Sequence, residues 1–202
     1  MIKNVIFDIG NVLCNYAWPE FFLERTGGDQ KMVERLAAAT VNHETWPAWD
    51  IGNLSYSGLI EMMCKNDPEI ADVIRDVFRD IKGLLTPRDY ALPWIEKLQA
   101  AGYFVYYLSN MSRPAIEQCP EAMYFIPYTD GGILSFRFHH VKPAPDIYHL
   151  LEERYHLIPK ECVFIDDSEK NIETAKNLGW HGIVFTDSAQ AEDELKALGV
   201  TY

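Results

Sequence analysis

Four short apolar runs constrain the fold of this chain more than any other feature of its sequence. Each run is rich in Val, Ile, Phe or Tyr and is bounded by turn-forming or acidic residues; the four cover residues 4–9, 103–108, 162–165 and 182–185. Continuous apolar runs of this length are typical of strands buried on both faces of a parallel sheet. The sequence therefore predicts four buried strands.

Amphipathic stretches of helical length follow these runs or lie between them, at residues 88–101, 146–155, 171–178 and 189–198. Pro145 suits the first turn of the second stretch. Gly179 and Gly199 suit the left-handed position that ends a helix. Strands that alternate with helices predict a Rossmann-like, doubly wound α/β sheet.

The segment from residue 16 to residue 83 interrupts this alternation. It contains no convincing strand, and its pattern predicts helices at residues 19–25, 30–39, 55–64 and 68–82. We expect a core formed by residues 1–15 and 84–202, with a small all-α cap inserted after the first strand. Further along, Asp130-Gly131-Gly132 is a turn signal, and residues 133–139 predict an extra strand or a hairpin.

Composition narrows the partners and the compartment. The 202 residues include 18 Lys and Arg against 30 Asp and Glu, which gives a formal net charge of −12. Binding to nucleic acid or to anionic membranes needs surplus positive charge, so we expect neither. No apolar run approaches the ~18 residues of a membrane span, and the four scattered cysteines form no disulfide framework or zinc motif. We expect a cytoplasmic protein that is a monomer or a homodimer.

Polar residues stand where three of the predicted strands end, and a lysine precedes one of the predicted helices: Asp8, Ser109-Asn110, Asp166-Asp167-Ser168 and Lys142-Pro143. Ligands of open α/β sheets bind outside the carboxyl ends of the strands, so these side chains should converge. Converging carboxylates suit Mg²⁺, and a lysine with a hydroxyl nearby suits a phosphoryl group. A carboxylate in such a site can act as a nucleophile.

Four ordered motifs resemble those of the haloacid dehalogenase (HAD) superfamily. They are Phe7-Asp8-Ile9-Gly10-Asn11-Val12-Leu13, Leu108-Ser109-Asn110, Lys142-Pro143 and Ile165-Asp166-Asp167-Ser168. The resemblance covers nearly the whole chain, because the predicted helical insertion is similar to the family's α-helical cap. The Asp-x-Gly-Asn-Val pattern resembles a branch that includes sugar-phosphate phosphatases.

The resemblance implies a role for each matching residue. Asp8 matches the nucleophile and a metal ligand, the Gly10 carbonyl matches a second ligand, and Asp167 is the best match for a third. Asp166 is either a neighbour of the ligands or an alternative ligand. The matches to the phosphate- and substrate-binding positions are Ser109, Asn110, Lys142 and Asn11, with Lys142 also paired with the nucleophile. Ser168 and Asn171 are expected to lie next to the metal ligands, where Asn171 would orient the carboxylates.

The chain departs from the family pattern at Gly10, where HAD phosphatases carry a second aspartate as general acid and base. The departure implies a slower enzyme, a substrate with a good leaving group, or an acid supplied by the cap. The cap candidates are His43, Glu44 and Asp50.

The resemblance implies a Mg²⁺-dependent phosphatase that hydrolyses a small phosphorylated metabolite, with a sugar phosphate as one candidate, through an aspartyl phosphate. Three alternatives stay open. A haloacid dehalogenase would use the same nucleophile without a metal. A phosphonatase would need a cap lysine, for which Lys31 is the nearest candidate. A non-catalytic protein would bind a phosphorylated metabolite without turning it over.

Overall fold

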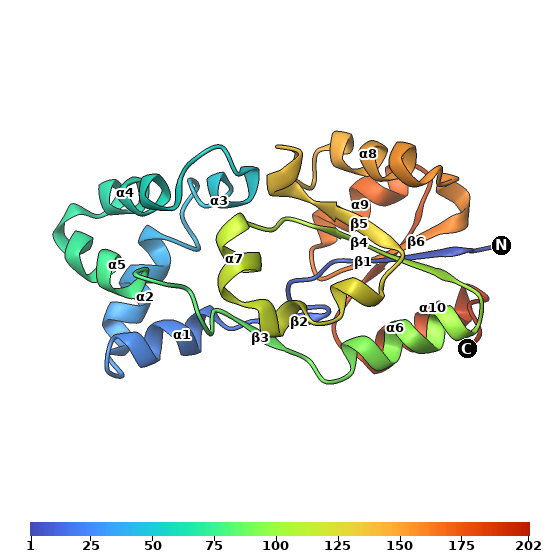
Figure 1. The fold of residues 1–202 in the computed structure, drawn as a ribbon, viewed down its shortest axis with the longest axis horizontal. Coiled ribbons are helices and arrows are strands. Elements are labelled where there is room, and N and C mark those ends of the chain that lie inside the picture. Colours follow the sequence, from blue (N-terminus) through green and yellow to red (C-terminus); the bar gives the residue numbers. More distant parts are fainter.

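The computed structural model describes residues 1–202 and contains a five-stranded parallel sheet (Figure 1). The strand order is β5-β4-β1-β6-β7, with β1 in the centre. The strands are β1 (Asn4–Phe7), β4 (Phe104–Ser109), β5 (Gly131–Leu134), β6 (Cys162–Asp166) and β7 (His181–Val184). All four predicted strands are present, with ends within two residues of those expected.

Strand β5 corrects the expectation for residues 133–139. It begins two residues earlier, pairs in parallel with β4, and is followed by a 3-10 turn, so the hairpin alternative is wrong. The Gly131-Gly132 pair lies inside the strand and not in a turn. A Cβ at Gly132 would collide with the main-chain oxygen of Tyr107, which is the kind of close approach that requires glycine in a strand.

The sheet is covered on both faces by helices (Figure 1). Alternate residues of β1 point to opposite sides, so that Val5 and Phe7 belong to one buried cluster and Ile6 to the other. Helices α6 (Ala91–Ala100) and α10 (Ser188–Ala197) cover the first face, and α8 (Pro145–Tyr155) and α9 (Glu169–Asn177) cover the second. This arrangement confirms the predicted doubly wound sheet.

A helical insertion, defined here as residues 17–84, lies at one end of the molecule between strands β2 and β3 (Figure 1). Its helices are α1 (Trp18–Arg25), α2 (Gln30–Ala39), α3 (Ala48–Ile51), α4 (Tyr56–Asn66) and α5 (Ala71–Val77). The Asp29 and Ser55 side chains cap α2 and α4 by accepting main-chain hydrogen bonds. The division of the chain into a core and a cap domain stays a prediction.

The structure differs from the sequence prediction at both edges of the insertion. Strands β2 (Cys14–Tyr16) and β3 (Leu85–Pro87) form an antiparallel pair that the sequence analysis missed, because three residues are too few to show a periodicity. The expected helix 68–82 is too long. Beyond α5 the chain leaves the helix, and the main chain of Ile81 bonds to Gln118 and Cys119 instead.

The remaining elements are short. Ser112 caps helix α7 (Arg113–Gln118) by accepting a hydrogen bond from the Ala115 amide. The 3-10 turns are η1 (Pro68–Ile70), η2 (Pro120–Met123), η3 (Ile126–Tyr128), η4 (Ser135–Arg137) and η5 (Pro159–Glu161). None of the helices has both the length and the apolar character needed to cross a bilayer.

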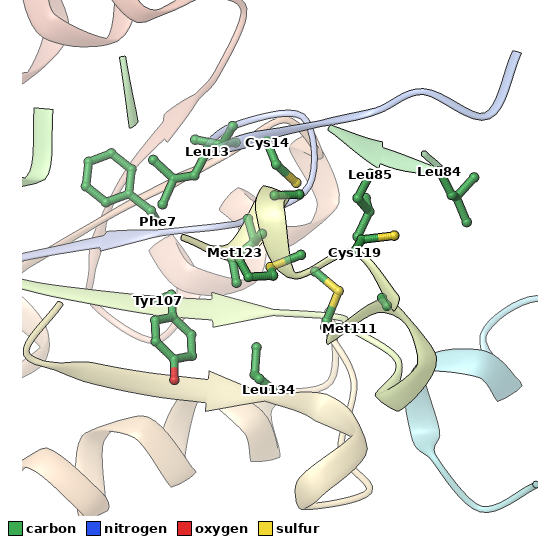
Figure 2. Packing of buried hydrophobic residues seen from close by; sticks show 14 of the residues in the cluster. Phe7, Leu13, Cys14, Leu84, Leu85, Tyr107, Met111, Cys119, Met123 and Leu134 are labelled. Atoms are coloured by element: carbon green, nitrogen blue, oxygen red, sulfur yellow. The ribbon is translucent and has the colours of Figure 1, made fainter. Parts of the chain in front are cut away.

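The larger buried cluster runs without a break from the sheet to the insertion (Figure 2). Phe7 and Tyr107 lie on the sheet, Leu85 lies on β3, and Met111 follows β4, and all four belong to this cluster. The same cluster includes Phe78, Ile81 and Leu84 of the insertion, so one continuous apolar core joins the insertion to the sheet.

Phe78 is the centre of the aromatic packing inside the insertion. Its ring is fully buried and lies 5.7–6.4 Å, centroid to centroid, from the rings of Phe21, Phe22, Trp46 and Trp49. Edge-to-face and tilted pairs at these distances add to the stability that burial provides.

We expect Phe78→Ala to lower the free energy of unfolding by about 3–5 kcal/mol, because it removes a buried ring and leaves a cavity. Urea denaturation followed by circular dichroism measures this loss. Leu54→Ala is the matched control, because the Leu54 side chain is exposed and its truncation should change stability by less than about 0.5 kcal/mol. Equal losses in the two variants would contradict the central role of Phe78.

Candidate active site

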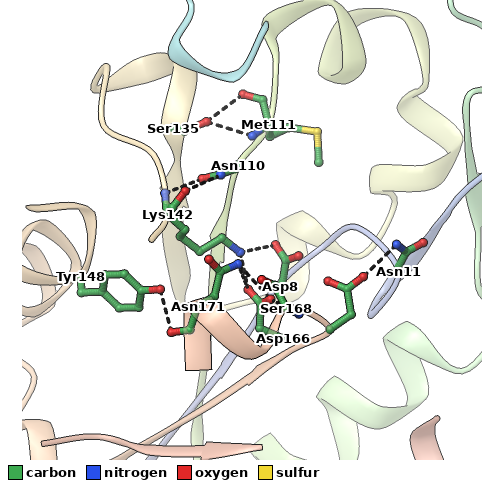
Figure 3. A network of polar contacts seen from close by, with 11 residues as sticks. Asp8, Asn11, Asn110, Met111, Ser135, Lys142, Tyr148, Asp166, Ser168 and Asn171 are labelled. Atoms are coloured by element: carbon green, nitrogen blue, oxygen red, sulfur yellow. Dashed lines mark hydrogen bonds and ion pairs between the residues drawn. The ribbon is translucent and has the colours of Figure 1, made fainter. Parts of the chain in front are cut away.

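Three carboxylates converge at the carboxyl end of the central strands (Figure 3). Asp8 follows β1 directly, Asp166 is the last residue of the neighbouring strand β6, and Asp167 comes next. The strands are in register, with Phe7 opposite Ile165, so they end at the same level. One carboxylate oxygen from each of the three residues lies within 4.8 Å of the others.

Lys142 lies between two of these carboxylates. Its Nζ is 2.8 Å from Asp8 Oδ1 and 2.6 Å from Asp166 Oδ2, and its side chain is almost fully buried. Burial alone would lower the pKa of Lys142, but Asp8 and Asp166 raise it above its ordinary value. The lysine is therefore a fixed positive charge beside the predicted nucleophile.

Asp166 has both carboxylate oxygens occupied by protein donors. Oδ1 accepts hydrogen bonds from the Ser168 amide at 2.7 Å and from Asn171 Nδ2 at 3.0 Å. Oδ2 accepts from Lys142 at 2.6 Å and again from Asn171 at 3.0 Å. These contacts hold the Asp166 side chain in place, and Asp166 in turn orients the Lys142 side chain.

Asp167 is in a different position, exposed and less engaged. One hydrogen bond reaches its side chain, from Asn11 Nδ2 to Asp167 Oδ2 at 2.8 Å. Asn11 has a positive φ of 57°, and its Oδ1 accepts a hydrogen bond from the Tyr16 amide at 3.2 Å. The predicted substrate-binding residue Asn11 thus orients Asp167 in this structure.

Ser109 and Asn110 lie at the end of β4, as predicted, but their side chains make different contacts. The Ser109 hydroxyl is buried and has no hydrogen-bond partner in the protein. The Asn110 side chain accepts from the Lys142 amide at 2.7 Å and donates to the Lys142 carbonyl at 3.0 Å. Asn110 was predicted at the site from the sequence, but its anchoring of the lysine's main chain was not.

A cavity of about 200 Å³ opens beside these groups. Part of the cavity is lined by Asp8, Gly10, Asn11 and Asp167, and another part by residues of the insertion and of the β2–β3 pair. This second group includes aromatic and apolar side chains: Tyr16, Trp46, Trp49, Ile81, Leu84 and Leu85. The Tyr16 hydroxyl and the Trp49 Nε1 are buried and unpartnered, so a ligand here would meet polar groups as well as rings.

The electrostatics of the site leave an excess of negative charge. Burial raises the pKa of Asp8 to about 6, although the nearby Lys142 works in the opposite direction. Lys142 pairs with Asp8 and Asp166, whereas the Asp167 carboxylate has no cationic partner and accepts one hydrogen bond, from Asn11. Oxygen ligands with uncompensated charge are the set that a hard divalent cation prefers, so the site fits a metal ion such as Mg²⁺.

The three residues of the insertion that were candidates for the missing acid differ in their position relative to the cavity. Of these, only Asp50 lines the cavity. His43 Nδ1 lies 3.0 Å from the Thr45 hydroxyl, and the Glu44 side chain is exposed to solvent. The structure thus brings one of the three to the predicted site.

We expect Lys142→Met to lower the free energy of unfolding by about 3–5 kcal/mol at pH 8, because two buried carboxylates lose their positive partner. A carboxyl whose folded pKa is raised destabilises the fold above that pKa, and the penalty falls as protonation proceeds. The loss should therefore shrink as the pH falls from 8 through about 6, the pKa of Asp8.

Urea denaturation at pH 8 and at pH 5 measures this difference. Lys160→Met is the control, because Lys160 is exposed. A Lys142→Met loss as small as that of the control, or one that grows as the pH falls, would contradict the role given to the buried lysine.

Curated relatives of the chain include two phosphatases. The sesquiterpene phosphatase astK of Aspergillus oryzae is 25% identical over 97% of this chain and 96% of its own. The D-ribitol-5-phosphate phosphatase of Bacteroides thetaiotaomicron is 27% identical over 98% of each chain. These similarities extend over the sheet and the insertion alike.

A solved structure shares the fold. A wild-type HAD family enzyme from Bacteroides thetaiotaomicron, in complex with magnesium and inorganic phosphate, superposes with a TM-score of 0.67 and 23% identity. The match covers 95% of this chain and 99% of that one. The family model for haloacid dehalogenase-like hydrolases matches residues 2–179. The chain therefore belongs to the haloacid dehalogenase-like hydrolase family.

Proposed function

We propose that this chain is a Mg²⁺-dependent phosphatase that hydrolyses a small phosphomonoester through an aspartyl phosphate on Asp8. One observation carries the proposal. A buried lysine, an unpartnered serine hydroxyl and three carboxylates meet where β1, β4 and β6 end. This combination provides a nucleophile, a cation site and donors for phosphoryl oxygens at one edge of the sheet.

The residues that would hold the metal are Asp8, Asp167 and the carbonyl of Gly10. Asp166 is the weaker candidate, because its oxygens are already bonded to Lys142, Ser168 and Asn171. When bound, Mg²⁺ would neutralise part of the charge on the phosphoryl group. The magnesium and phosphate in the related Bacteroides structure support this part of the proposal.

The chain's own groups perform the proposed steps. The Asp8 carboxylate attacks phosphorus, a bond forms between its oxygen and phosphorus, and the bond to the leaving oxygen breaks. Lys142 and the Ser109 hydroxyl hold phosphoryl oxygens, as preorganised donors that need no rearrangement during the reaction. Water then attacks the aspartyl phosphate and releases inorganic phosphate, which regenerates Asp8.

The substrate class rests on the cavity and on the relatives. A cavity of about 200 Å³ admits a small leaving group, and its wall offers both rings and polar atoms. The related phosphatases are named for a sesquiterpene and for D-ribitol 5-phosphate, and a sugar phosphate stays one candidate substrate here.

The four cysteines are all free and buried, which supports the proposed cytoplasmic location. A monomeric or homodimeric state stays a prediction.

The alternative activities are less well supported by the geometry. A metal-independent dehalogenase has no use for the second and third carboxylates that meet Asp8. A phosphonatase would need a lysine in the cavity, whereas Lys31 is exposed at the start of α2 and does not line it. The non-catalytic alternative is decided by measuring turnover.

We expect Asp8→Asn to reduce phosphate release by ~10⁴–10⁶-fold, the scale for losing a covalent nucleophile. A malachite green assay with Mg²⁺ and a panel of small phosphomonoesters measures the rate, and circular dichroism checks that the fold is kept. Asp193→Asn is the matched control, because Asp193 is exposed on α10 and its variant should keep full activity. Substantial turnover by pure Asp8→Asn would disprove the nucleophile assignment.

Chelation provides an independent test. With EDTA we expect phosphate release to fall to background, because the carboxylates then repel the phosphate group, and added Mg²⁺ should restore it. Halide release from a 2-haloacid should stay at background under both conditions. Phosphate release that is insensitive to EDTA would overturn the metal requirement, and EDTA-insensitive halide release would favour the dehalogenase.

A further inference from the structure

The proposed reaction lacks one component at the position where the family motif would supply it. When the bond between phosphorus and the leaving oxygen breaks, that oxygen needs a proton, and Gly10 has no side chain to give one. A Cβ built on Gly10 meets no atom within 4 Å, so the space beside Asp8 is open. A proton donor from another element can therefore reach this space.

Asp50 is the candidate that the structure brings to this space. The carboxyl groups that line the cavity are Asp8, Asp167 and Asp50, and only the last comes from the insertion. No protein group donates a hydrogen bond to the Asp50 carboxyl. Its oxygens are thus left for a ligand, in contrast to those of Asp166, which are fully used.

The main chain around Asp50 is fixed to the core of the protein. The Ser135 hydroxyl donates to the Asp50 carbonyl at 2.6 Å, and the same hydroxyl accepts from the Met111 amide at 2.9 Å. His139 Nδ1 lies 2.8 Å from the carbonyl oxygen of Ile51. Helix α3 is therefore docked on the segments that follow β4 and β5, and this docking fixes the main chain that carries the Asp50 side chain over the cavity.

Gly52 allows this docking. It ends α3 with a left-handed φ of +75°, and a Cβ at Gly52 would lie 2.8 Å from the carbonyl oxygen of Phe136. A larger residue could not approach the 3-10 turn so closely. The close approach places Asp50 by a rigid main-chain contact, which is what a catalytic side chain requires.

The surroundings of Asp50 bring its pKa close to neutral pH. Burial and the nearby charge of Asp8 together raise the pKa of Asp50 to about 7, and Lys142 acts in the opposite direction. Tyr16, which also lines the cavity, has a pKa raised by burial and by the charge of Asp50. A carboxylic acid with this pKa can both donate and accept a proton at neutral pH.

We propose that Asp50 is the general acid and base of this active site and replaces the carboxylate that is absent at Gly10. The inference rests on the proposed phosphatase function. In the first step the Asp50 carboxylic acid gives its proton to the leaving oxygen as the bond from phosphorus breaks, and the alcohol departs. In the second step the Asp50 carboxylate takes a proton from the water that attacks the aspartyl phosphate on Asp8. Phosphate is released, and both side chains return to their initial states.

The test compares two probes that differ in their need for protonation. Phenol is a poor leaving group, with a pKa of about 10 like that of tyrosine, whereas 4-nitrophenol is far more acidic and leaves without help. In single-turnover experiments Asp50→Asn should cleave phenyl phosphate ~10²–10⁴-fold more slowly than the unmodified protein. Release of 4-nitrophenol from 4-nitrophenyl phosphate should change by less than about threefold, because this step needs little acid catalysis.

The second step gives an additional signature. With excess 4-nitrophenyl phosphate, Asp50→Asn should show a burst of nitrophenol followed by a slow steady rate, because the aspartyl phosphate accumulates without a base to activate water. The matched control is Glu44→Gln, another acidic residue of the insertion that is exposed and lies outside the cavity. It should behave like the unmodified protein with both probes.

A rescue variant guards against an indirect effect. Gly10→Asp in the Asp50→Asn background introduces a carboxyl into the open space beside Asp8, and phenyl phosphate cleavage should recover at least about tenfold. Equal slowing of both probes by Asp50→Asn, or no slowing of either, would overturn the assignment of Asp50. Absence of Mg²⁺-dependent phosphate release by the unmodified protein would instead overturn the proposed function, so the two failures are distinguishable.

Discussion

The buried lysine between two carboxylates is the contact on which the site depends. Parallel strands β1 and β6 end side by side, so the acidic residues that follow them are forced together. Lys142 contacts Asp8 and Asp166 at once and offsets their repulsion within a buried site. Asn110 fixes the lysine's main chain from the neighbouring strand, so three adjacent strands contribute to one charge arrangement.

The sequence was sufficient for the features that follow from sheet geometry. Buried strands appear as apolar runs, and parallel strands end at one edge, so the meeting of Asp8 with Asp166 and Asp167 could be predicted without coordinates. Contacts that depend on side-chain direction could not. The two hydrogen bonds of Asn110 to Lys142, and the engagement of Asn11 with Asp167, follow from rotamers and a positive φ that no periodicity encodes.

Short helices and strands were also difficult to predict from the sequence. The β2–β3 pair and the four-residue helix α3 are below the length at which a pattern can be recognised, yet they border the cavity or carry residues that line it. From the sequence, three residues of the insertion were equally good candidates for the acid. Only the docking of α3, through Ser135 and Gly52, separates Asp50 from His43 and Glu44.

The docking of α3 also restricts how molecules reach the site. Hydrogen bonds attach the insertion to the core at several places in addition to the β2–β3 pair. Ile81 bonds to Gln118 and Cys119, and helix α3 bonds to Ser135 and His139. An insertion held at several places does not rotate freely about a single hinge. Any movement of the insertion away from the sheet must break the hydrogen bonds of α3 as well as bend the β2–β3 pair.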